Sequence, residues 1–73
     1  MSRIGALGAA VSVEGFALAG ALVFTADEPS DIESAWRVLP DDVGVLILTS
    51  VAADHLADRL DERPRLLVVV MPA

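Results

Sequence analysis

The hydrophobic positions of this chain fall into four short runs, separated by segments with helical or turn patterns. The apolar runs cover residues 3–7, 21–24, 43–49 and 65–71. Short runs without polar alternation are typical of strands that a parallel sheet buries on both faces. The segments between them place apolar residues three and four positions apart, which predicts helices. The pattern therefore predicts the order β-α-β-α-β-α-β.

The first predicted helix lies inside an unusually apolar stretch. The stretch from Ile4 to Ala26 carries one charge, Glu14, and is long enough to cross a bilayer. A membrane span or a signal peptide is the alternative interpretation. The central Glu14 and the repeated glycines argue against it, since both disfavour an apolar spanning helix. We predict instead that Ser12 or a neighbour opens a helix to Ala19, and that Gly20 ends it.

Two further helices follow from capping patterns. The sequence Ser30-Asp31-Ile32-Glu33 predicts a capping box that opens a helix to Val38 or Leu39, with Trp36 on its apolar face. Ser50 is predicted to cap a third helix that runs to about Glu62. Strands that alternate with helices predict a single three-layer α/β/α domain over residues 1–73. Its four-stranded parallel sheet would have helices on both faces, in a Rossmann-like or receiver-like topology.

Composition excludes several classes of function. The 73 residues contain no cysteine and no lysine, and the net charge is −6. Disulfides and thiolate metal sites are therefore impossible, and the lack of cysteine fits a cytoplasmic location. Nucleic-acid binding needs clustered basic side chains and often exposed aromatic ones. This acidic chain has no such cluster and is a poor candidate for binding a phosphate backbone. We expect no nucleic-acid partner.

The predicted strand ends have few residues that could catalyse a reaction or bind a ligand. In parallel α/β folds, ligands bind at the carboxyl ends of the strands. Here those ends are Gly8-Ala9, Thr25 to Asp27, Thr49-Ser50 and Met71-Pro72, with no dinucleotide fingerprint, phosphate-loop lysine or phosphoacceptor cluster. Asp54, Asp58 and Asp61 share one helix face, which could be a cation site or a docking strip but fits a solvated face better. We expect no catalytic residue, cofactor or metal.

Three segments of the chain resemble a known family. They are "EGFALAGALVF", "ILTSVAADHLADRL" and "PRLLVVVMP". Together they resemble the F subunit of the V-type (vacuolar/archaeal) ATPase and ATP synthase. That family has a first strand ending in glycine and then a Gly-Phe-x-Leu-Ala-Gly helix. The matching positions here are Gly8, Gly15, Phe16, Leu18, Ala19 and Gly20.

The resemblance implies a non-catalytic subunit in the central stalk of a rotary ATPase. The F subunit binds the coiled-coil D subunit beside other stalk subunits, helps to transmit torque, needs no cofactor and is peripheral to the membrane. Ala9 and Ala17 depart from the family's usual residues, and the family's C-terminal helical tail has no counterpart up to Ala73. In this interpretation Gly15 and Gly20 let the first helix pack closely on the sheet, and Phe16 anchors it.

We expect the partner-binding surface near the strand carboxyl ends and the first helix. The candidate residues are Thr25, Ala26, Asp27, Glu28, Ser50, Val51 and Asp54. An alternative function is a small receiver-like ligand-binding or signalling domain without a phosphoacceptor. The mean hydropathy of +0.62 also indicates an exposed apolar patch, so the isolated chain could form a homodimer.

Overall fold

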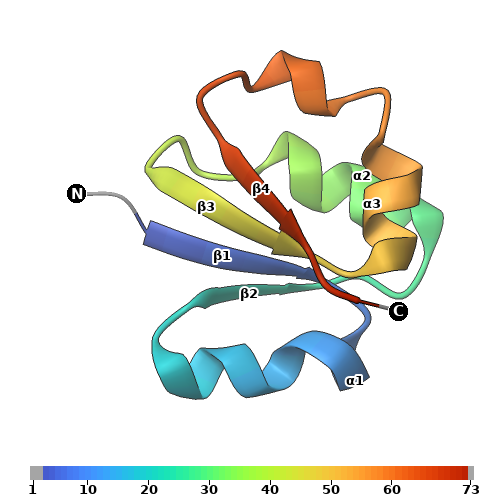
Figure 1. Cartoon of the computed structure of the whole chain (residues 1–73). Helices are drawn as coiled ribbons and strands as arrows, with labels where there is room; N and C mark the ends of the chain where they lie inside the picture. Colours follow the sequence, from blue (N-terminus) through green and yellow to red (C-terminus); the bar gives the residue numbers. More distant parts are fainter. Residues whose placement is uncertain (1–2, 73) are drawn as a thin grey trace.

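The structure, a computed structural model, describes residues 3–72. Strands and helices alternate as predicted (Figure 1). In chain order the elements are β1 (Arg3–Gly8), α1 (Ala10–Val13), the 3₁₀-helix η1 (Glu14–Ala19), β2 (Leu22–Thr25), α2 (Pro29–Arg37), β3 (Val43–Leu48), α3 (Ser50–Leu56), the 3₁₀-helix η2 (Leu60–Glu62) and β4 (Leu67–Val70).

The four strands form one parallel sheet in the order β2-β1-β3-β4. Strands β1 and β3 are central, and β2 and β4 are the edges. Helix α1 and η1 lie on one face of the sheet, and α2 and α3 lie on the other (Figure 1). The predicted α/β class and layer arrangement are therefore confirmed.

The main hydrophobic core lies between the sheet and the α2–α3 layer. It contains Leu7, Ala26, Ile32, Trp36, Leu39, Val43, Leu46, Leu48, Ala52 and Leu56. Trp36 is only 2% exposed, and its Nε1–H donates to Glu62 Oε1 at 3.0 Å. The Arg63 guanidinium lies 5.2 Å from the centre of the Trp36 ring system. This tryptophan is thus a core residue with a satisfied polar group.

The first helix differs from its prediction. It begins at Ala10, and Ser12 is inside it rather than at its cap. After Val13 the chain tightens into η1, where 3.0 residues per turn bring Val13 and Phe16 to the same side. That tightening fits their burial, because Val13 is buried and Phe16 half-buried while the rest of η1 is exposed. Gly20 ends the segment with φ +88°, as predicted.

The predicted close packing of Gly15 is wrong. A Cβ built on Gly15 meets no atom within 4 Å, and the same holds for Gly20. Gly20 is used for its left-handed backbone, which glycine adopts at little cost. Gly8 is the crowded position instead, since a Cβ there would overlap the side chain of Thr49.

The capping box at Ser30 is also wrong. Helix α2 starts at Pro29 with Glu28 as its N-cap, and no side chain caps it. Proline fits the first helical position because its missing N–H would be unsatisfied there anyway. Glu33, the expected box partner, instead forms an ion pair with Arg59 of the α3–η2 turn. A long-range contact therefore takes the place of the local one.

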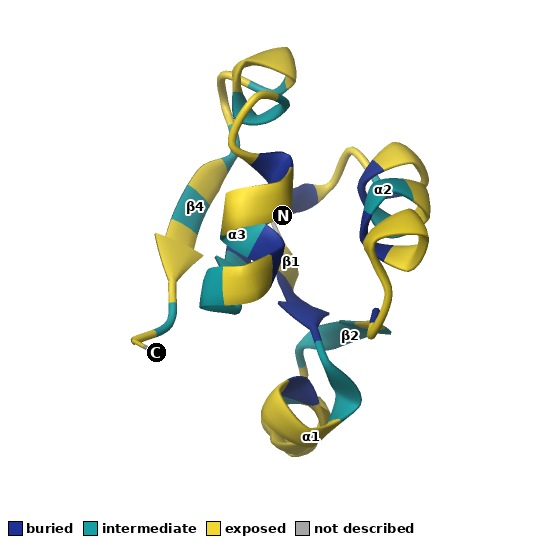
Figure 2. Ribbon diagram, turned by 90° about the vertical axis from the view of Figure 1, so that its right-hand side faces the viewer, coloured by how far each residue is buried: buried dark blue, intermediate teal, exposed yellow. Residues whose placement is uncertain are grey.

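The third helix is shorter than predicted, and the last strand is more exposed. Helix α3 ends at Leu56, and a turn leads to η2, so the chain to Glu62 is not one helix. The apolar run predicts a buried β4, but Leu67 is 60% exposed, Val69 46% and Val70 49%. Figure 2 shows β4 as a largely exposed edge. The reason is its place at the edge of the sheet, where one side of β4 has no neighbouring strand.

An ion pair ties β1 to the segment before β3. Arg3 Nε and Nη2 donate to the two carboxylate oxygens of Asp42 at 2.6 and 2.7 Å. The hydrogen bond from Arg3 lowers the pKa of Asp42 below its usual range. Both side chains are about half exposed, so solvent screens the pair and its contribution to stability is small.

Replacing Gly8 and Gly15, two glycines that match the family pattern, by alanine should affect stability differently. We expect Gly8→Ala to lower the free energy of unfolding by about 1–3 kcal/mol, because its Cβ would overlap Thr49. We expect Gly15→Ala to be neutral or to stabilise by up to about 1 kcal/mol, since the position is open and helical. Urea unfolding followed by the fluorescence of the single Trp36 measures both. Equal losses in the two variants would contradict the packing described.

Candidate partner-binding site

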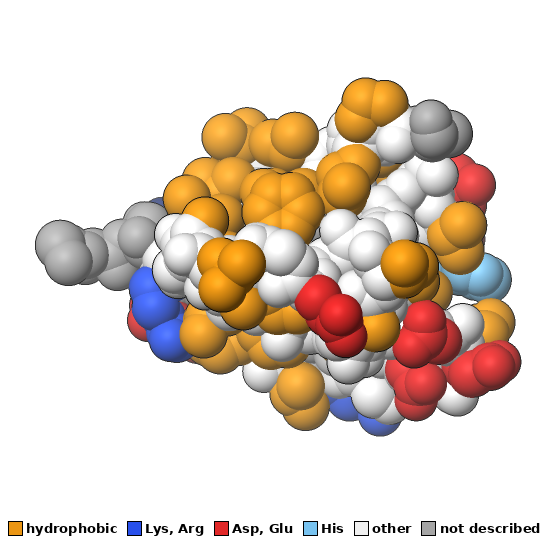
Figure 3. All heavy atoms as spheres, turned by 90° about the horizontal axis from the view of Figure 1, so that it is seen from below, with side chains coloured by type: hydrophobic (Ala, Val, Ile, Leu, Met, Phe, Trp, Pro, Cys, Tyr) orange, Lys and Arg blue, Asp and Glu red, His pale blue; other side chains and the backbone are white. Residues whose placement is uncertain are grey.

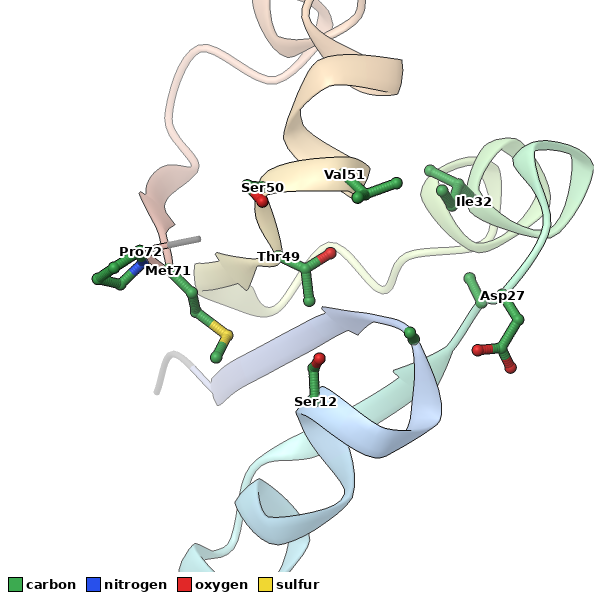
Figure 4. A pocket seen from close by; sticks show the side chains of 10 residues that line it. Ser12, Asp27, Ile32, Thr49, Ser50, Val51, Met71 and Pro72 are labelled. Carbon is green, nitrogen blue, oxygen red and sulfur yellow. The ribbon is translucent and has the colours of Figure 1, made fainter.

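A hollow of ≈ 370 Å³ opens at the carboxyl ends of the strands (Figure 4). It lies where α1 goes to one face of the sheet and α2 and α3 go to the other. Its walls come from the four segments that follow the four strands, and most of the lining residues are apolar. The lining residues are Ala9, Ser12, Ala26, Asp27, Ile32, Thr49, Ser50, Val51, Met71 and Pro72.

Thr49 holds the centre of the hollow. Its backbone N–H donates to Leu7 C=O at 3.2 Å, which joins the ends of β1 and β3. Its Oγ1 accepts from Ala52 N–H at 3.2 Å, so Thr49 is the N-cap of α3. The predicted cap, Ser50, is instead the first residue of the helix. A capping side chain reaches back to the first turn of a helix from a residue with extended backbone. Thr49 has that backbone (φ −67°, ψ 159°), whereas Ser50 is already helical.

Hydrogen bonds fix the other walls of the hollow. Ala26 N–H donates to Gly8 C=O at 2.8 Å, and Ala10 N–H donates to Asp27 Oδ1 at 3.3 Å. These two bonds hold the β2–α2 loop against the start of α1. On the other side, Met71 N–H donates to Leu48 C=O at 2.8 Å. This bond holds Met71 and Pro72, which follow β4, at the rim of the hollow. The shape of the hollow is therefore set largely by backbone contacts.

The structure brings part of the predicted surface together. Ala26, Asp27, Ser50 and Val51 all line the hollow, although the first two come from the β2–α2 loop and the last two from the first turn of α3. Thr25, Glu28 and Asp54 are exposed but are not lining residues.

Sequence reasoning missed Ser12 and Ile32 as lining residues. The sequence pattern assigns Ser12 to a helix cap and Ile32 to the core. Ile32 could have been found, because the first turn of a helix that follows a parallel strand lies near that strand's carboxyl end.

The six residues that match the family pattern have different structural roles. Gly8 allows the close approach of Thr49, and Gly20 makes the left-handed turn. Phe16 and Ala19 line another hollow with Ile4 and Ile47. The resemblance implies a structural role for Leu18, but this side chain is 94% exposed and packs in no core.

The electrostatic character of this end of the molecule is acidic. Among residues 3–72, Asp27 is the only charged residue that lines the hollow. Figure 3 shows acidic side chains gathered at the end where the strands finish, and basic ones mainly at the opposite end. Within the described range, no cluster of three or more acidic or histidine side chains is arranged to hold a metal ion. No helix between Arg3 and Pro72 is long and apolar enough to cross a bilayer.

Comparison with known families decides the assignment. The profile of the family described as ATP synthase (F/14-kDa) subunit matches residues 4–73. The chain belongs to this family. The resemblance inferred from the Gly-Phe-x-Leu-Ala-Gly segment is therefore confirmed. The F subunit is a non-catalytic component of the rotary ATPase, which agrees with the prediction that this chain is not an enzyme.

A solved structure shares the fold of this chain. The crystal structure of the F subunit of the V-type ATP synthase from Archaeoglobus fulgidus aligns with a TM-score of 0.60 and 22% identity. The alignment covers 97% of this chain and 98% of that one. No curated protein matches the sequence. At this identity, the crystal structure supports the fold alone.

The capping assignment at the hollow can be tested with neighbouring residues. Thr49→Val keeps the side-chain shape against Gly8 but removes the acceptor for Ala52 N–H. We expect it to cost about 1 kcal/mol of unfolding free energy. Ser50→Ala should change stability by less than about 0.5 kcal/mol. Thermal unfolding followed by circular dichroism measures both, and a larger loss for Ser50→Ala would make Ser50 the cap instead.

Proposed function

We propose that this F subunit works in the central stalk of a V-type rotary ATPase or ATP synthase, by binding the coiled-coil D subunit. Residues 1–73 would act there as one domain that helps to transmit torque. Family membership over residues 4–73 carries the proposal. The site agrees with it, since an apolar hollow with hydroxyl groups at its rim can receive a side chain of a partner helix. The protein would be cytoplasmic and peripheral to the membrane.

The proposed docking surface is the rim of the hollow. Val51 is 61% exposed at the start of α3 and gives this surface an apolar contact. Asp27, Glu28 and Asp54 are exposed acids around it. A partner helix with an apolar stripe flanked by lysine or arginine would complement both features. Such a helix would lie across the carboxyl ends of the strands.

Co-expression tests the proposal directly. The chain is produced with the coiled-coil D subunit encoded in the same genome, and complexes are analysed by size-exclusion chromatography with light scattering. A stable one-to-one complex is the expected result. A folded chain that elutes alone would overturn the stalk role. Stabilisation by a small molecule would then favour the alternative of a ligand-binding domain.

Two matched valines test the docking surface. Val51→Glu should weaken binding of the D subunit by about tenfold or more, because it places an acid in the apolar contact. Val38→Glu is the control, since Val38 is 69% exposed but lies after the last residue of α2, near the amino ends of the strands. It should bind the D subunit like the original chain. Calorimetric titration measures both, and equal effects would place the surface elsewhere.

A further inference from the structure

Strand β4 is an open edge of the sheet with an unusual composition. Residues 66–71 read LLVVVM, with no charge, proline or glycine among them. Natural edge strands are normally protected from pairing by lysine, proline, a bulge or a covering segment. The opposite edge, β2, is better protected, because its apolar residues are all half-buried and η1 packs beside it. The exposed side chains of β4 are apolar on both faces of the sheet.

The backbone of β4 shows which groups are available for pairing. Met71 N–H donates to Leu48 C=O of β3, so the main-chain groups of Met71 point inward. Along a strand, the N–H and C=O groups of successive residues point to opposite sides. The N–H and C=O groups of Leu67 and Val69, four and two residues before Met71, therefore also point toward β3. Those of Val68 and Val70 point away from the sheet. The free edge thus presents two residues, each with one donor and one acceptor.

We propose that the free β4 edge is a self-association surface, on which β4 of a second copy pairs antiparallel about a twofold axis. An axis perpendicular to the sheet keeps equivalent faces together. One register uses both outward residues, with Val68 of each copy opposite Val70 of the other. It forms four backbone hydrogen bonds, because each such pair exchanges two. Val69 then lies on the axis beside Val69 of the second copy.

This register also covers the exposed apolar side chains. Leu67 and Val69 share one face of the sheet, since they pair with Val45 and Ile47, and Val68 and Val70 share the other. In the dimer, Leu67 lies opposite Met71 of the second copy. Every cross-strand pair is apolar, and β-branched pairs of this kind stabilise sheets. A second copy is therefore complementary to this edge in hydrogen bonding and in side-chain character.

Charge and size limit the strength of the association. Each chain carries a net charge of −6, so two copies repel each other. Salt screens this repulsion, and dimerisation should increase with ionic strength. A pair of short strands buries less than the roughly 800 Å² per partner of a standard interface. We expect a reversible dimer whose measured mass rises with protein concentration.

Cysteine cross-linking tests the register on a chain that has no native cysteine. Directly opposed residues that are not hydrogen-bonded to each other have Cα atoms about 4.5 Å apart, within disulfide range. Val69→Cys should therefore form a covalent dimer under mild oxidation. Val70→Cys is the matched control on the same strand, being 49% exposed against 46% for Val69. It should cross-link at least about fivefold more slowly, because the two Val70 Cα atoms would be more than about 7 Å apart.

Sedimentation equilibrium of the cysteine-free chain gives an independent readout. The average mass should rise from one chain toward two with concentration and with added salt. Val69→Lys should abolish the rise, whereas Leu18→Lys, at a position 94% exposed on η1, should retain it. A chain that stays monomeric at all concentrations, or equal cross-linking of the two cysteine variants, overturns the proposal. Neither experiment involves the D subunit, so their failure is distinct from failure of the stalk role.

Discussion

The contact between Gly8 and Thr49 organises the functional end of this protein. The two central strands end side by side, and Thr49 packs where a Cβ on Gly8 would lie. The same threonine receives a backbone N–H from the first turn of α3, which would otherwise lack a partner. One side chain thus closes the β1–β3 junction and sets where α3 begins. The hollow at the strand ends exists because these two elements are fixed relative to each other.

Uneven coverage of the sheet explains the remaining surface properties. Two helices cover one face of the sheet, and a short α-helix followed by a 3₁₀-helix covers part of the other. These helices leave part of the second face uncovered beside β4, so Leu67 and Val69 are exposed there. In a chain of this size, little apolar area can be hidden without a partner. The apolar hollow with acidic side chains around it and the apolar β4 edge are then two different surfaces, one proposed to bind a helix and the other a strand.

The sequence predicted the architecture well and the local details less well. Apolar runs identified all four strands, because a strand in a parallel sheet is recognisable by its continuous hydrophobicity. The cap at Ser30 failed because Pro29 takes the first helical position and Glu33 pairs with Arg59, far along the chain. Of the seven candidate residues, Ala26, Asp27, Ser50 and Val51 line the hollow. Ala26 and Val51 follow directly from strand ends, whereas Ser12 enters the hollow only through the fold of α1.

The sequence by itself determined the order of elements, the parallel sheet and the family, since these depend on hydrophobic periodicity and on a short glycine motif within one segment. Tertiary structure alone decided which strand became an exposed edge and which residue capped α3. It also decided that Gly8, rather than Gly15, is the glycine under steric constraint. The physical reason is the same in each case. Burial and close approach depend on neighbours that are distant in sequence, and the hydrophobic pattern of β4 is identical whether one face is covered or two.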